Sequence, residues 1–337
     1  MANLRPQSTK LVLSYNKESA YGTAVLDANI GRLFDLVEPG LAEVAIEMLS
    51  DDALIKGHEF PNDINYNIQV ARDVTIPFSF HASPELAGAL MALALGTYSA
   101  SGAGPYVHTI TALDGTSSDQ LPSTSLVQVV QGDTATYKKY KGACVNEFKL
   151  SVQNRGRVGM SGSFFTDGSA ADAAAFSIPS SKEPVTPLHG TGATFGTANS
   201  GSGVVDASAS LRSWDFTWNN NLDRADNRGQ VAAGINLTTL RFGGRSMSMV
   251  VKVQGNKGDA YWTDWQANTL KNVEVQCVSG SYSIKIAIPR CLITNVKDSF
   301  DGIRNVNEVT YKPFATTTTS KTPITVTVTS QVAAYLL

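Results

Sequence analysis

The chain has 337 residues, of which 42% are apolar and 17% are charged, and its net charge is −2. This length accommodates two domains of ordinary size, and the apolar fraction is typical of a globular protein. The near-zero net charge excludes a protein that grips nucleic acid by neutralising many phosphates. The low charged fraction favours a protein whose surface becomes covered by neighbouring subunits.

No segment predicts export, a membrane partner, a metal or a cofactor. The opening residues, MANLRPQSTK, lack the apolar core of a secretory signal, so we expect a protein made in the cytoplasm. The most apolar run, 87–95, is too short to cross a bilayer. Cys144, Cys277 and Cys291 are odd in number and lack CxxC spacing, which predicts reduced cysteines packed as small apolar residues.

Alternating apolar and polar residues, the pattern of half-buried strands, dominate the sequence. In 74–81 this pattern contains Pro77, which favours a strand edge or a bulge because proline cannot donate to a ladder. We expect Pro289 to end the strand that precedes it, and PITVTVTS to form a strand near the C-terminus. Three other segments show the same alternation, namely 214–218, 247–253 and 282–288.

Two segments are predicted to be helical. The first covers 84–95, because Ser83 is a typical N-cap, Pro84 suits the first helical position and Gly96 is a natural terminator. The second covers 260–271 and places an aromatic stripe on one side. The members of that stripe are Tyr261, Trp262 and Trp265.

The order of these elements indicates an internal duplication. KGACVNEFKLSVQNRGRVGMSGSFF and PRCLITNVKDSFDGIRNVNEVTYKPF each place a cysteine before an alternating run, a glycine-containing turn and a second run. We therefore expect one β domain in 1–166 and a second in 211–337. Residues 167–210 are rich in Ala, Gly, Ser, Thr and Pro, which predicts a flexible linker or a long exposed loop.

A search for catalytic motifs yields no candidate site, so the sequence predicts a protein that is not an enzyme. The four histidines lack metal-ligand spacing, and neither a P-loop nor a GxSxG motif is present. The densest basic cluster is Lys138, Lys139 and Lys141, interleaved with Tyr137 and Tyr140. Such a cluster can stack on single-stranded nucleic acid, but a strand with a basic solvent face is favoured.

The segment KESAYGTA resembles the N-terminal signature of siphophage tail tube proteins. SPELAGALMALALG resembles the helix of that family, and SIKIAIPRCLITNV with EVTYKPFA resembles its closing strands. The order of these blocks, which spans most of the chain, carries the resemblance. It implies an assembly interface at Glu18, Ser19, Ala20, Tyr21, Gly22 and Thr23.

The resemblance also implies a mainly β (α+β) fold, a β-sandwich or barrel with a flanking helix, here in two pseudo-repeated tube-like halves. Such subunits close into rings that stack into the tail tube of the virion, through which DNA is ejected without specific binding. Two halves per chain favour a ring of three copies, and six copies stay possible. The implied partners are a tape-measure protein and the tail terminator and baseplate proteins, in a tail made in the host bacterial cytoplasm.

Two alternatives stay open from the sequence. The first is another phage ring or lattice protein, namely a tail terminator, a baseplate hub or a capsid decoration protein. The second is a carbohydrate-binding β-sandwich module that would use four tryptophans as stacking platforms. These are Trp214, Trp218, Trp262 and Trp265. The alternation around the first two is typical of a buried face and argues against the module.

Overall fold

A computed structural model describes most of the chain. The described residues are 8–38, 40–50, 67–114, 120–131, 136–153, 155–173, 176–179, 185–224, 237, 239–255, 260–301, 304–315 and 322–336. Their strands form one 18-stranded antiparallel sheet and a separate two-stranded sheet. The prediction of a mainly β fold is confirmed.

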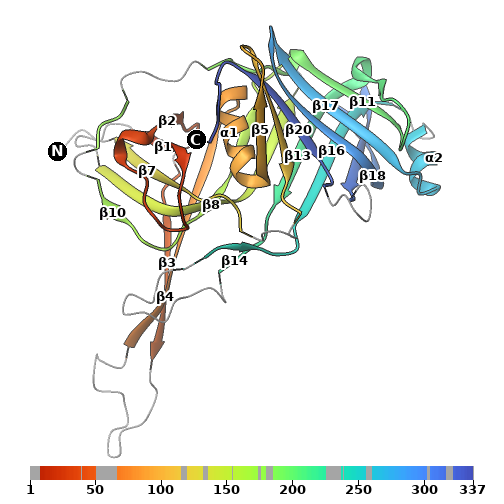
Figure 1. The fold of residues 1–337 in the computed structure, drawn as a ribbon. Helices are drawn as coiled ribbons and strands as arrows, with labels where there is room; N and C mark the ends of the chain where they lie inside the picture. Colours follow the sequence, from red (N-terminus) through yellow and green to blue (C-terminus); the bar gives the residue numbers. More distant parts are fainter. Residues whose placement is uncertain are drawn as a thin grey trace, which may run out of the picture.

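The first part of the chain supplies ten strands and one long helix (Figure 1). The strands are β1 (Ser8–Lys17), β2 (Ile30–Asp35), β3 (Glu43–Ser50), β4 (Asn67–His81), β5 (Gly96–Ser101), β6 (Tyr106–Ala112), β7 (Thr124–Gln131), β8 (Thr136–Gln153), β9 (Gly159–Phe165) and β10 (Ala171–Asp172). The helix is α1 (Pro84–Leu95), and a short 3-10 turn, η1 (Asp27–Asn29), precedes β2.

The second part supplies the other strands and a shorter helix, α2 (Ala260–Gln266). The strands are β11 (Ala193–Asn199), β12 (Val205–Asp206), β13 (Leu211–Asn219), β14 (Leu222–Asp223), β15 (Arg241–Phe242), β16 (Ser246–Gln254), β17 (Lys271–Ser279), β18 (Tyr282–Asp301), β19 (Arg304–Pro313) and β20 (Thr325–Ser330). Two short 3-10 turns, η3 (Gly190–Gly192) and η4 (Ser208–Ser210), flank β11 and β12.

The strand pairings of the first part recur in the second. In the first part of the chain, β1 pairs with β2 and β7, β8 pairs with β7, β9 and β10, and β4 pairs with β3 and β9. In the second part, β11 pairs in the same way with β12 and β17, β18 pairs with β17, β19 and β20, and β16 pairs with β13 and β19. The helices also match, because α1 follows β4 and α2 follows β16.

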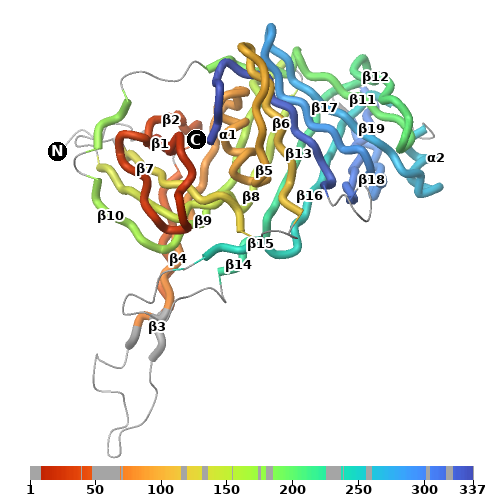
Figure 2. Tube along the Cα trace, in the orientation of Figure 1, coloured from red at the N-terminus to blue at the C-terminus, as the bar shows by residue number. Residues whose placement is uncertain are grey.

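Two pairings join these series into one sheet. β8 pairs with β13 along seven residue pairs, and β6 pairs with β20 along six. The N-terminal series lies on the left of Figure 1 and the C-terminal series on the right, with α1 between them. Figure 2 shows β3 and β4 leaving the body together as an arm.

Strand β18 continues through Pro289, so the prediction that this proline ends the strand is wrong. β18 pairs with β20 along Ser283–Ala287 and with β19 along Cys291–Asp301. Its register against β17 shifts between Ile288 and Cys291, which leaves Pro289 at a bulge. Because the strand changes partners at this bulge, no ladder hydrogen bond from Pro289 is required.

The expected linker, 167–210, contains a paired strand in its second part. β11 pairs with β17 from Ala193 to Asn199, and Phe195 is buried in the core. The composition of this segment is too polar to pack alone, and the ladder with β17 supplies the stabilisation. Here the structure differs from the prediction of a linker or loop.

Helix α1 spans the residues predicted for it. The Ser83 side chain accepts a hydrogen bond from the backbone N–H of Leu86, and Gly96 ends the helix at a φ of 95°. All twelve residues of α1 are buried, because the helix packs against β5, β6, β8, β18 and β20. A helix that is covered on all sides needs no polar stripe, which explains its uniformly apolar sequence. The second predicted helix is present but ends at Gln266.

The core confirms the buried alternation of β13 and excludes its tryptophans as stacking platforms. Trp214, Phe216 and Trp218 are at most 1% exposed. β20 also belongs to the core, because Val326 and Val328 are fully buried. The carbohydrate-binding alternative therefore loses two of its four platforms.

Candidate assembly surfaces

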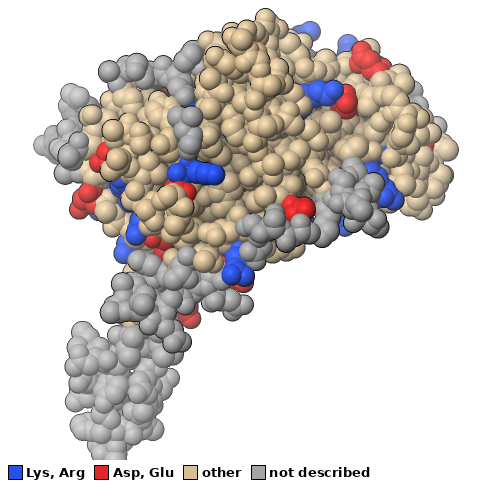
Figure 3. All heavy atoms as spheres, in the orientation of Figure 1, with Lys and Arg blue, Asp and Glu red and all other residues tan. Residues whose placement is uncertain are grey.

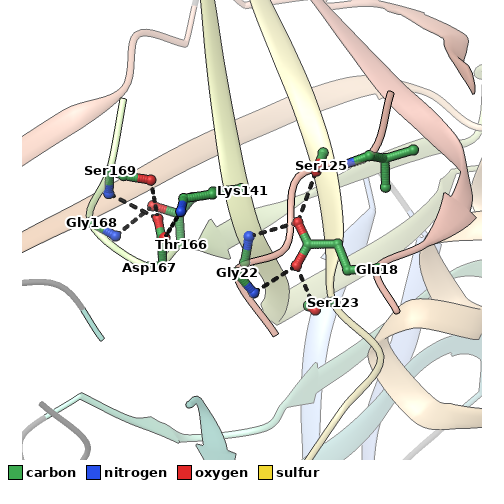
Figure 4. A network of polar contacts seen from close by, with 11 residues as sticks. Glu18, Gly22, Ser123, Ser125, Lys141, Thr166, Asp167, Gly168 and Ser169 are labelled. Carbon is green, nitrogen blue, oxygen red and sulfur yellow. Dashed lines mark hydrogen bonds and ion pairs between the residues drawn. The ribbon is translucent and has the colours of Figure 1, made fainter. Parts of the chain in front are cut away.

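The predicted interface segment begins with a buried carboxylate. The Glu18 side chain accepts hydrogen bonds from the hydroxyls of Ser123 and Ser125, both at 2.8 Å (Figure 4). It also accepts the backbone N–H groups of Gly22 and Gly142, both at 2.9 Å. These donors come from the turn after β1, from β7 and its approach, and from the bend of β8. Glu18 therefore holds three segments of its own chain together.

A second buried carboxylate, Asp167, lies beside this network (Figure 4). Its oxygen Oδ1 accepts the backbone N–H of Ser169 at 2.8 Å, and Oδ2 lies 3.5 Å from the Lys141 ammonium. Gly142 adopts a φ of 63°, and a Cβ there would lie 2.9 Å from Asp167 and 3.0 Å from the Tyr21 ring. Burial raises the pKa of Tyr21 well above its usual range. This region is a packed internal junction.

The six residues implied as an interface thus divide into two groups. Glu18 is buried, and Tyr21 and Gly22 are half-buried against the junction. Gly22 has a φ of 73°, which favours glycine in this turn. The outward-facing members are Ser19, Ala20 and Thr23. The interface role stays a prediction, and the exposed group is the part that a neighbouring subunit can reach.

A second surface is the polar face of an eight-strand run. Its order is β3–β4–β9–β8–β13–β16–β19–β18. Successive residues of these strands alternate between the core and this face. A groove crosses it over β4, β9, β8 and β13. Its lining includes Pro77, Ser79, Glu147, Lys149, Ser161 and Thr217.

Charges on this polar face are paired across strands. The Lys149 ammonium lies 3.2 Å from the Asp215 carboxylate, between β8 and β13. The Lys252 ammonium lies 3.1 Å from Glu308, between β16 and β19. Opposite charges at this range largely cancel one another's field for a distant polyanion. The face is therefore hydrophilic without a strong net charge of either sign.

The two ends of the eight-strand run carry unpaired edges. Within the described residues, β3 pairs only with β4, and the part of β18 after Cys291 pairs only with β19. Exposed apolar side chains gather at these ends, with Phe300 79% exposed and Val44 46% exposed. Leu41 and Ile46 are also exposed. Free edges of this kind are templates for pairing with another chain.

The basic cluster is neutralised within the chain. Lys138 pairs with Asp172, Lys139 pairs with Asp27, and Lys141 lies near Asp167. This arrangement fits the favoured solvent-face interpretation better than a nucleic-acid site. Figure 3 shows few charged side chains over the region of α1, β5 and β20.

Within the described residues, neither a metal-binding cluster nor a membrane-spanning helix is present. No cluster of three or more His, Cys, Asp or Glu side chains in this part of the chain is placed to hold a metal ion. Within the same part, no helix has the length and apolarity to cross a membrane. Cys144, Cys277 and Cys291 are free and buried, so all three pack in the interior as predicted.

Comparison with known protein families identifies a match that covers most of the chain. A family model described as "Phage tail tube protein" matches residues 8–332, which is nearly the whole chain. No curated protein matches.

Proposed function

The chain belongs to the phage tail tube protein family, and from this premise we propose that three copies close into a ring. The family makes the chain a structural protein of the virion tail that assembles into a tube with other copies. The proposal adds the copy number, the lumen surface and the partners. The tube is the conduit for DNA ejection, and the subunits are made in the host cytoplasm before assembly.

The observation that carries the copy number is the repeated pairing pattern. Each chain contributes two equivalent four-strand units, β3–β4–β9–β8 and β13–β16–β19–β18, to one continuous run. Three such chains give a pseudo-sixfold ring, as six single-unit chains would. We assign the two tube-like halves to these series, and the second half then begins at β11, within the expected linker 167–210.

The polar face of the eight-strand run is the proposed lumen surface. This face carries small hydroxyl side chains and cross-strand ion pairs. Because its lysines are paired with carboxylates, they provide no excess positive charge to bind DNA phosphates. Along most of the run the opposite face packs against the core, and its exposed apolar side chains lie at the two end strands. DNA therefore passes along the lumen without specific binding, and a tape-measure protein occupies the same space before ejection. Tail terminator and baseplate proteins close the two ends of the stack.

The exposed turn residues are the proposed contact with a neighbouring subunit. Ser19, Ala20 and Thr23 face outward from a turn whose position is set by the buried Glu18. Because Glu18 acts within its own chain, substitutions at the exposed three are the appropriate test. Ala20→Arg introduces a bulky charge there and should impair tube formation while leaving the monomer's melting temperature unchanged. Normal tubes from Ala20→Arg would exclude this contact.

Electron microscopy and light scattering of the purified full chain test the proposal. Hollow rings or tubes are expected, and a single ring should have three times the chain mass of 35.8 kDa. A ring of six chain masses would overturn the three-copy assignment. A protein that stays monomeric when concentrated, with and without a tape-measure protein, would overturn self-assembly through these surfaces.

A further inference from the structure

The junction between the two halves of the chain shows how one unit pairs with the next. β8 of the first half and β13 of the second are antiparallel, from Gln153 opposite Ser213 to Glu147 opposite Asn219. By the repeated pairing pattern, β18 is the equivalent of β8, and β3 is the equivalent of β13. The two unpaired edges are therefore the equivalents of two strands that do pair inside the chain.

Matching irregularities align β8 with β18 residue by residue. Against β9, β8 carries an extra residue just before Glu147. Against β19, β18 carries an extra residue just before Asn295. Superimposing these bulges makes Glu147 equivalent to Asn295, and two residues later it makes Lys149 equivalent to Lys297.

The partners of these residues align β4 with β16. Glu147 faces Ser163 in β9, and Asn295 faces Thr310 in β19, so Ser163 and Thr310 are equivalent. Ser163 faces Pro77 on its other side, and Thr310 faces Val250. Pro77 in β4 is therefore equivalent to Val250 in β16.

The same reasoning aligns β3 with β13. Pro77 and Val250 are equivalent, so the residues two positions before them, Thr75 and Ser248, are equivalent too. Thr75 faces Glu43 in β3, and Ser248 faces Thr217 in β13. Glu43 is therefore equivalent to Thr217, which faces Lys149 across the junction inside the chain.

We propose that β3 of one copy pairs antiparallel with β18 of the next copy, with Glu43 opposite Lys297 and Val44 opposite Val296. This inference rests on the proposed function, because it names the contact that closes the ring. The contact joins two different surfaces of the same chain, and such heterologous contacts generate rings when the rotation closes. It reproduces between copies the pairing that β8 and β13 make within one copy.

The side chains at these positions are complementary in this register. Glu43 and Lys297 are both exposed, have opposite charges and lie on the polar face. Val44 is 46% exposed on the core side of the edge, where Val296 would cover it.

Other registers fit less well. A shift of one residue turns the polar side chains of one strand against the core face of the other. A shift of two residues sets Glu43 opposite Asn295 or Ser299, which removes the charge pair. The aligned register is the one in which charge and apolar contacts are both matched.

Disulfide trapping in assembled tubes tests the register. Glu43→Cys with Lys297→Cys in the same chain should give covalently linked chains on a non-reducing gel after mild oxidation, because directly opposed residues lie within disulfide range. Glu43→Cys with Asn295→Cys is the matched control, two residues out of register on the same face. We expect it to link at least tenfold less. The three native cysteines are buried, so they do not compete.

The outcomes separate this inference from the proposed function. The register is supported if disulfides link the chains in tubes of the Glu43→Cys, Lys297→Cys variant but not in tubes of the control variant. Tubes that link only in the control, or in neither variant, overturn the register and leave the tube role intact. Failure of the unsubstituted chain to form rings or tubes overturns the proposed function itself.

A charge exchange provides a second readout that needs no oxidation. Glu43→Lys places like charges across the seam and should raise the critical concentration for assembly by about five- to tenfold, since each seam in the ring is affected. Adding Lys297→Glu should restore it to within about twofold. Restoration would support the pairing of these two residues, and an additive loss in the double variant would overturn it.

Discussion

The Tyr335 hydroxyl donates a hydrogen bond of 2.8 Å to the carbonyl of Pro84, in the first turn of α1. The Tyr335 ring is fully buried and lies directly over Gly88, where a Cβ would come within 2.4 Å of it. Arg32 donates to the Tyr335 carbonyl at 2.9 Å. One residue near the C-terminus therefore contacts both the central helix and β2.

This contact predicts that Tyr335 stabilises the whole body of the protein. Tyr335→Phe removes the hydroxyl and its hydrogen bond to the Pro84 carbonyl, which should lower the free energy of unfolding by about 0.5–1.5 kcal/mol. Tyr335→Ala also leaves a large cavity over α1 and should cost about 3–5 kcal/mol. Denaturant unfolding of the full chain measures both values. Equal losses for the two variants would show that the ring itself contributes nothing.

Gly162 in β9 is predicted to be irreplaceable for a steric reason. A Cβ at this position would lie 2.1 Å from the backbone carbonyl oxygen of Glu147 and 2.7 Å from the Phe78 ring. Backbone atoms of a paired strand cannot retreat, so Gly162→Ala should cost at least about 3 kcal/mol. Gly159→Ala in the same strand is the control, since nothing lies within 4 Å of a Cβ there. Comparable unfolding midpoints for the two variants would contradict this account.

The sequence predicts elements that depend on local signals. Helix α1 has the expected bounds because Ser83, Pro84 and Gly96 each act within one turn of the backbone. The strand around Trp214 has its expected buried face because alternation alone determines which side chains point inward. Pro77 lies in a strand that is paired on both sides over part of its length, not at a sheet edge; at Pro77 itself β4 is paired with β9, and its ladder with β3 ends at Thr75.

Features that depend on distant partners are not predictable from local patterns. Residues 193–199 become a strand only because β17 offers an edge, and their composition alone indicates a loop. Pro289 lies at a bulge in β18, at the point where the pairing partner of this strand changes from β20 to β19. The inward orientation of Glu18 follows from Ser123, Ser125 and Gly142, which are more than 100 residues away in the chain.

Glu18 is predicted to stabilise the fold through its four donors. Glu18→Gln replaces one accepting oxygen with an NH₂ group that faces donors already present, so it should cost about 1–3 kcal/mol. Glu47→Gln, at an exposed carboxylate, is the matched control and should change stability by less than about 0.5 kcal/mol. Equal unfolding midpoints for the two variants would exclude the proposed anchoring role. Urea unfolding monitored by tryptophan fluorescence provides the comparison.

The buried thiols predict a loss of stability at high pH. Burial raises the pKa values of Cys277 and Cys291 to about 12, from a usual value near 9. Both thiols are protonated in both states below pH 9, so their contribution to stability is complete there. As the pH rises from about 9 towards 12, the unfolded chain loses these protons first and gains stability. The free energy of unfolding should therefore fall by up to about 1.4 kcal/mol per pH unit for each thiol.

Thiol labelling and a cysteine variant test this account together. The native protein at pH 8 should react with a thiol reagent at least a hundredfold more slowly than the chain in guanidinium, because its thiols are buried and protonated. Cys277→Ala should make the free energy of unfolding fall less steeply between pH 9 and pH 11, because the contribution of one thiol to the slope is removed. An unchanged slope would show that Cys277 does not titrate differently in the folded and unfolded states. Fast labelling of the native protein would show that the thiols open to solvent without global unfolding.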